Sequence, residues 1–104
     1  MRVDKRPQIS DDGRPTLLLV DDDPVFCRVL TRALERRGYA VSVAGDVAAA
    51  LVLAEEQSPE YAVVDLKMPG ESGLVLIGKL LARDPHTRVV MLTGYASIAT
   101  AVEA

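Results

Sequence analysis

The chain of 104 residues contains one cysteine, no tryptophan and no long apolar run. Because Cys27 has no second cysteine to pair with, a disulfide framework within the chain is excluded. No stretch approaches the roughly 18 consecutive apolar residues of a membrane helix. The charged first 15 residues also lack the apolar centre of a secretion signal. We therefore expect a cytoplasmic protein without a membrane segment.

Basic residues are slightly fewer than acidic ones, with 12 Lys and Arg against 15 Asp and Glu, for a formal net charge of −3. The basic residues are scattered and form no stripe of the kind that binds a phosphate backbone. Direct binding of nucleic acid by this segment is therefore not expected. The length is that of a single domain, which buries roughly two thirds of the surface its unfolded chain would expose.

The chain changes character at residue 16. Residues 1–15 are rich in charge, proline and glycine and predict a flexible leader, while residues 16–104 predict one folded domain. Within that domain, short apolar runs alternate with longer segments of helical periodicity. Strands are predicted at 16–20, 40–44, 61–64 and 88–92, with a helix after each, the fourth starting near residue 98. Repeated strand–helix units with right-handed crossovers give an α/β fold with a doubly wound parallel sheet.

The helices carry recognisable end signals and apolar faces. Asp23 and Pro24 suit the start of the first helix, and Gly38 suits its end. Asp46 caps the second helix, and the third is expected at about 72–83. The residues predicted to face the core are Phe26, Val29, Leu30, Ala33 and Leu34 in the first helix, Val47, Leu51 and Ala54 in the second, and Leu74, Ile77, Leu80 and Leu81 in the third.

Polar side chains follow three of the predicted strands. Asp21 and Asp22 come after the first, Asp65 ends the third, and Thr93 follows the fourth. Ligands bind outside the carboxyl ends of strands in such sheets. Three carboxylates placed together repel one another unless a cation is present, and an oxygen-only site suits Mg²⁺. With the metal bound, one carboxylate could attack phosphorus while Thr93 donates to a phosphoryl oxygen; Asp23 is interpreted as a helix cap.

Three segments resemble the signature of the receiver domain of two-component response regulators. They are Val20-Asp21-Asp22-Asp23, the run from Val64 to Gly70 with Gly73 after it, and Met91-Leu92-Thr93-Gly94-Tyr95. The resemblance covers residues 16–104 and implies a flavodoxin-like, three-layer αβα fold with strand order 2-1-3-4. It implies that Asp65 accepts a phosphoryl group from a sensor histidine kinase and that Thr93 is the switch hydroxyl. The implied Mg²⁺ ligands are Asp22 directly, Asp21 largely through water, Asp65, and the backbone carbonyl of Lys67.

Within this family, the first and last segments are similar to the redox-responding RegA/PrrA-type transcriptional regulators, which carry a helix-turn-helix output domain after the receiver. The resemblance also implies a fifth strand ending in a lysine, and a fifth helix, both beyond Ala104. A chain ending there is expected to be truncated and impaired in phosphorylation. Its strand at 88–92 would be an uncovered edge, so we expect self-association through this strand or through the fourth helix.

Two other functions remain open from the residues. The first is a phosphatase of the haloacid-dehalogenase type, using Asp21 and Asp23 as its Asp-x-Asp pair. That type needs later basic and acidic residues that the chain lacks, and it leaves Asp65 unexplained. The second is a receiver remnant that binds partners without phosphorylation. We favour the signalling phosphoacceptor, which is not an enzyme in the ordinary sense. Cys27 is interpreted as a packed core residue.

Overall fold

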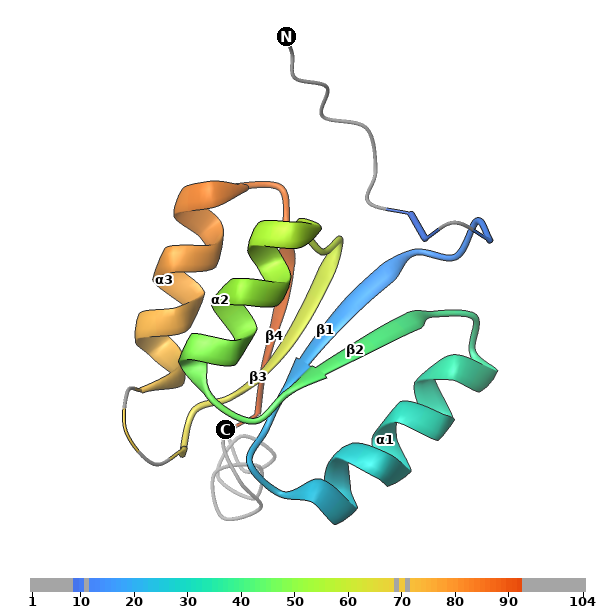
Figure 1. The fold of residues 1–104 in the computed structure, drawn as a ribbon, viewed down its shortest axis with the longest axis horizontal. Coiled ribbons are helices and arrows are strands. Elements are labelled where there is room, and N and C mark those ends of the chain that lie inside the picture. The colour runs from blue at the N-terminus through green and yellow to red at the C-terminus, as the bar shows by residue number, and fades with distance from the viewer. Residues whose placement is uncertain (1–8, 11, 69, 71, 93–104) are drawn as a thin grey trace, which may run out of the picture.

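The computed structural model describes residues 9–10, 12–68, 70 and 72–92, and these form a parallel sheet flanked by helices (Figure 1). The strands of this described part lie in the order β2-β1-β3-β4, and the pairings between them are parallel. The α/β, doubly wound fold and its strand order are therefore confirmed. The elements are β1 (Thr16–Val20), α1 (Pro24–Arg36), β2 (Ala40–Ala44), α2 (Val47–Glu56), β3 (Tyr61–Asp65), α3 (Gly73–Arg83) and β4 (Arg88–Leu92).

The sheet is the middle of three layers. Helix α1 covers one face, and α2 and α3 cover the other (Figure 1). Strand β1 lies between β2 and β3, and all five of its residues are buried. Its side chains alternate between two cores: Leu17 and Leu19 pack with Cys27 under α1, whereas Leu18 and Val20 pack under α2 and α3. The predicted packed role of Cys27 is confirmed.

The ends of α1 follow the sequence signals closely. The carboxylate of Asp23 accepts hydrogen bonds from the backbone N–H groups of Val25 and Phe26, and Pro24 occupies the first helical position. Gly38 follows the helix with φ of 99°, a left-handed conformation that glycine adopts without steric cost. Asp23 and Pro24 thus fix the start of α1, and Gly38 ends it and lets the chain return to β2.

Two of the predicted helix faces are partly wrong. In α1, Cys27 is buried and Leu30 and Leu34 pack beside it, while Phe26 and Val29 are 37% and 62% exposed. In α3, the buried residues are Gly73, Leu76 and Leu80, while Leu74 is 59% exposed. In both helices, part of the predicted apolar stripe thus faces away from the sheet. Val29 and Leu74 therefore lie on a flank of their helices, whereas Leu30, Leu34 and Leu80 face the core as predicted.

Within the first 15 residues, the described positions 9–10 and 12–15 make hydrogen bonds with one another and with the folded domain. Ile9 pairs with Pro15 in an antiparallel bridge, and its carbonyl accepts from the side chain of Gln57. The Arg14 guanidinium pairs with the Asp12 carboxylate at 2.8 Å and also donates to the carbonyl of Tyr39. Satisfied local hydrogen bonds offset the entropy of ordering this turn. The predicted fourth helix lies outside the described residues.

Candidate functional site

The predicted acidic residues meet at the carboxyl end of the two central strands. Val20 and Val64 are partners in the register of β1 and β3, so the residues that follow them lie side by side. Asp21, Asp22 and Asp65 each offer a carboxylate oxygen, and these oxygens lie within 4.8 Å of one another. The structure thus brings together the three acids that the sequence placed at this edge.

Asp21 is the most enclosed of the three, with 9% of its surface exposed. Its Oδ1 accepts a hydrogen bond of 2.9 Å from the backbone N–H of Asp23. Burial raises the pKa of Asp21 above its usual value, the Asp23 N–H bond lowers this pKa, and the nearby charges of Asp65 and Asp22 raise it further. The carboxylate is therefore held in one orientation, and the single N–H of Asp23 stabilises its negative charge only in part.

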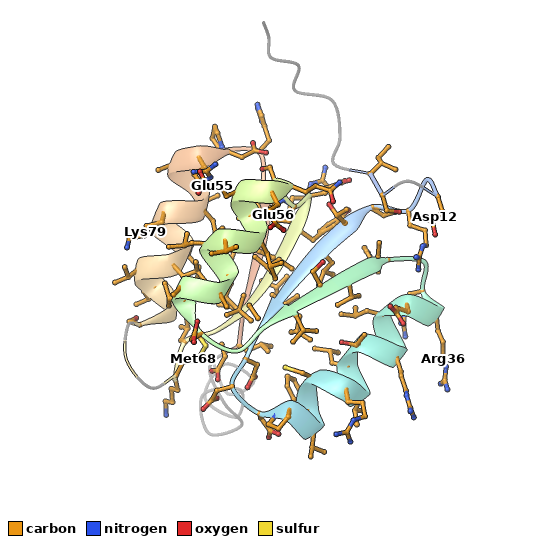
Figure 2. All side chains as sticks on the ribbon, in the orientation of Figure 1. Asp12, Arg36, Glu55, Glu56, Met68 and Lys79 are labelled. Atoms are coloured by element: carbon orange, nitrogen blue, oxygen red, sulfur yellow. The ribbon has the colours of Figure 1, made fainter. Side chains whose placement is uncertain are left out.

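Asp65 is half-buried at the end of β3 and is fixed through its backbone and its side chain. Its Oδ1 accepts a hydrogen bond of 2.9 Å from the N–H of Lys67. The next residue, Leu66, donates its N–H to the carbonyl of Leu92 in β4 at 2.9 Å. Met68, at the same end of the sheet (Figure 2), is 8% exposed and packs in the core under α2 and α3. The loop that carries the acceptor candidate is thus anchored on both sides.

The donor set fits a small, hard divalent cation. All three side chains offer oxygen, and no nitrogen or sulfur ligand is part of the cluster. Mg²⁺ prefers one or two carboxylates together with further oxygen ligands and water. Asp23 is not part of the cluster, and its Oδ1 accepts two hydrogen bonds in the cap of α1. This use of Asp23 removes support for an Asp21/Asp23 catalytic pair.

Thr93, the predicted switch hydroxyl, lies outside the described residues. Gly73, noticed in the sequence without a role of its own, lies against the backbone of Asp65 and Leu66. The signal that could have singled it out is a glycine in the first turn of a predicted helix, where glycine disfavours the helix.

Comparison with known proteins gives the family. The sequence model of the response regulator receiver domain family matches residues 17–104. The chain therefore belongs to this family. It is 45% identical over 97 residues to the photosynthetic apparatus regulatory protein RegA of Rhodovulum sulfidophilum, covering 93% of this chain and 52% of that protein. The receiver assignment and its similarity to RegA-type regulators are thus confirmed. The chain spans about half the length of this relative.

Solved structures agree with this assignment. A response regulator from Burkholderia pseudomallei, crystallised with a phosphorylated aspartic acid, a calcium ion and citrate, has a TM-score of 0.75 and 49% identity, over 85% of this chain and 52% of that one. The response regulator TrrA, in a complex with the histidine kinase ThkA, has a TM-score of 0.72 and 28% identity, over 78% of this chain and 70% of that one. Among the described residues, no helix has the length and apolar character needed to cross a membrane.

Proposed function

We propose that this receiver takes a phosphoryl group on Asp65 from a sensor histidine kinase, in the presence of Mg²⁺. The observation that carries the proposal is the convergence of Asp21, Asp22 and Asp65, with carboxylate oxygens within 4.8 Å, from the ends of two adjacent strands. One carboxylate can then act as the acceptor beside a cation that the whole cluster holds. Asp65 is taken as the acceptor because the resemblance of its segment to the receiver signature implies this role, and a 49% identical response regulator carries a phosphorylated aspartic acid.

In this proposal Asp21, Asp22, Asp65 and the backbone carbonyl of Lys67 hold the Mg²⁺. The bound metal supplies positive charge that offsets the repulsion between the carboxylates and the incoming phosphoryl oxygens. Asp21 is oriented by the Asp23 N–H and Asp65 by the Lys67 N–H, so both carboxylates are pre-positioned. Such preorganisation lowers the cost of bringing the reacting groups together.

The transfer step is a displacement at phosphorus. A carboxylate oxygen of Asp65 forms a P–O bond as the P–N bond of the phosphohistidine breaks, and the electron pair of that bond returns to the imidazole nitrogen. The product is an acyl phosphate on Asp65 and a histidine on the kinase. The charge added at Asp65 then draws the hydroxyl of Thr93 toward the phosphoryl group, which shifts a two-state equilibrium in the domain.

The partners follow from the same assignment. The kinase complex of TrrA supports a histidine kinase as donor, and the similarity to RegA supports a role in transcription through a longer protein. We retain the division into a leader at 1–15 and a receiver domain at 16–104, and a cytoplasmic location, as parts of this proposal.

The acceptor is tested by intact-mass measurement after incubation with Mg²⁺ and acetyl phosphate. The wild type should gain one phosphoryl group, Asp65→Asn should gain none, and Asp12→Asn, which removes an acid at the other end of the sheet, should behave as the wild type. An equal gain in Asp65→Asn would contradict the proposal. No gain in the wild type, with Mg²⁺ bound, would contradict it as well.

A phosphatase would give a different pattern. Turnover of a phosphate monoester that is abolished in Asp21→Asn and unchanged in Asp65→Asn would favour the haloacid-dehalogenase type. The hydrogen bonds that Asp23 accepts in the cap of α1 argue against Asp23 as the second acid of such a pair.

We also propose that a second copy of the chain pairs with β4. Among the described strands, β4 is at the edge of the sheet, and Val90 and Met91 are 53% and 55% exposed. The charge of β4 is confined to its first residue, Arg88, and an edge strand whose remaining residues are apolar tends to pair with another strand. Sedimentation should show a dimer that Val90→Lys dissociates. A stable monomer at high concentration would contradict this proposal.

A further inference from the structure

Gly73 occupies a place where no other residue fits without movement. A Cβ added to Gly73 would lie 2.9 Å from the Cα of Leu66 and 3.0 Å from the carbonyl carbon of Asp65, with the carbonyl oxygen of Asp65 nearer still. All three neighbours are backbone atoms, which cannot swing away as the end of a long side chain can. The first turn of α3 therefore rests directly on the peptide that joins Asp65 to Leu66.

The same peptide is held from its other side by β4. The N–H of Leu66 donates to the carbonyl of Leu92 at 2.9 Å, as the continuation of the β3–β4 ladder. The peptide between Asp65 and Leu66 thus lies between Gly73 and Leu92. Any displacement imposed by a larger residue at 73 must strain this hydrogen bond or move α3.

Helix α3 has little freedom to move. Leu76 and Leu80 are 0% and 2% exposed and pack in the same core as Val64 and Met68. The start of the helix is fixed by Ser72, whose side chain accepts from the N–H of Leu74 at 3.0 Å. Because interiors are densely packed, shifting this helix costs free energy, so strain at Gly73 is passed on to the end of β3.

The end of β3 carries the groups that the proposed function needs. The peptide pressed by Gly73 is one bond from the Cα of Asp65, and the loop continues directly to Lys67, whose N–H donates to Asp65 Oδ1. We propose that Gly73 is a positioning residue for the acceptor: its missing side chain lets α3 hold Asp65 and the Lys67 carbonyl in place. This inference rests on the proposed function and adds a residue to it.

The experiment compares three variants for Mg²⁺ affinity, by titration followed through backbone amide NMR signals. Gly73→Ala should weaken Mg²⁺ binding by about 10- to 100-fold, as changes to residues that orient metal ligands commonly do. Gly78→Ala is the matched control, because it lies in the same helix with nothing within 4 Å of an added Cβ, and its affinity should equal that of the wild type. Leu80→Val lowers stability away from the site and should also keep the wild-type affinity.

The metal-free spectra separate this inference from the proposed function. Gly73→Ala should shift the amide signals of Asp65, Leu66 and Lys67, whereas Gly78→Ala should leave them in place. Mg²⁺ affinity in Gly73→Ala equal to that in Leu80→Val, or unshifted Leu66 and Lys67 signals, would overturn the inference. Failure of Asp65→Asn to prevent mass gain would overturn the proposed function instead.

If Gly73→Ala does not fold, the wild type alone gives the answer. On titration with Mg²⁺, the amide signals of Gly73 and Leu74 should move together with that of Lys67 and at the same metal concentration, while Gly78 stays unmoved. A Gly73 signal that does not respond would overturn the inference.

Discussion

Asp21 is the most buried of the three acids in the site, and its pKa is raised. Its carboxylate is nearly buried, faces two other acids, and receives one hydrogen bond from the Asp23 N–H. The raised pKa means that the folded protein binds this proton more tightly than the unfolded chain does. In the metal-free protein, the associated stability is fully present below the unfolded pKa and is lost as pH rises through the folded pKa.

Replacing Asp21 by Asn should therefore stabilise the metal-free protein at neutral pH. The amide keeps an oxygen that can accept from Asp23 but carries no charge to bury. Urea unfolding in a chelator should show Asp21→Asn to be more stable than the wild type at pH 7 and nearly equal to it below the unfolded pKa of Asp. With saturating Mg²⁺, the wild type should instead be more stable than Asp21→Asn. A stability difference that is independent of pH would contradict this explanation.

The same acidic residues also affect the thiol of Cys27. Its thiol donates to the backbone carbonyl of Asp21 at 3.4 Å, and burial, followed by the charges of Asp21, Asp23 and Asp22, raises its pKa. Because the thiolate is the reactive form, this cysteine is expected to be inert in the folded protein. The packed role inferred for Cys27 from the sequence thus has an electrostatic as well as a steric basis.

At the scale of single elements, α1 depends on Asp23 for its start. The side chain accepts from two N–H groups that would otherwise lack partners in the first turn. Asp23→Ala should lower the free energy of unfolding by about 1 kcal/mol, whereas Asp23→Ser, which retains a capping oxygen, should lose much less. Urea denaturation followed by circular dichroism measures both.

The two variants also test whether Asp23 is a metal ligand. Since Asp23 is outside the carboxylate cluster, the Mg²⁺ affinity of Asp23→Ser should stay close to the wild type, while that of Asp22→Asn should fall strongly. Equal losses in the two variants would show that Asp23 belongs to the metal site and that its cap is secondary.

The positions of the elements could be predicted from the sequence, but not every face could. The start of α1 is marked by Asp23 and Pro24 and its end by Gly38, and the effect of each of these residues on the backbone is local. The face that a helix presents depends on its packing. In α3 the predicted stripe favoured the large residues Leu74 and Leu81, yet the helix turns Gly73 and Leu76 to the sheet, because only glycine allows the close approach to Asp65.

The acidic site was predictable for a related reason. Parallel strands end at one edge, so an acid after β1 and an acid at the end of β3 meet wherever the two strands are neighbours. The contact of α3 with the Asp65 peptide could not be predicted, since it depends on the depth of helix packing and involves no side chain at position 73. The strand order thus brings the three carboxylates together, and the close packing of α3 holds the peptide that follows Asp65.

At the scale of the whole molecule, the site joins the two central strands of the sheet. Asp21 and Asp22 follow β1, and Asp65 ends β3. Strand β1 contributes Leu17 and Leu19 to one core and Leu18 and Val20 to the other. A ligand that bridges these strand ends binds only when the sheet is formed. Metal binding should therefore stabilise the entire domain and not just the loops at its edge.

Mg²⁺ should raise the free energy of unfolding by about 2.7 kcal/mol at a concentration 100 times the dissociation constant, as mass action requires for a ligand of the native state alone. The urea midpoint should rise while the slope of the transition stays constant, because the surface exposed on unfolding is unchanged. Asp65→Asn should lose most of this stabilisation. Asp12→Asn, which removes an exposed acid in the turn near the amino end of β1 (Figure 2), should retain it. An equal Mg²⁺ effect in Asp65→Asn and the wild type would mean that the cation acts by general screening, and the bridge between β1 and β3 would have to be abandoned.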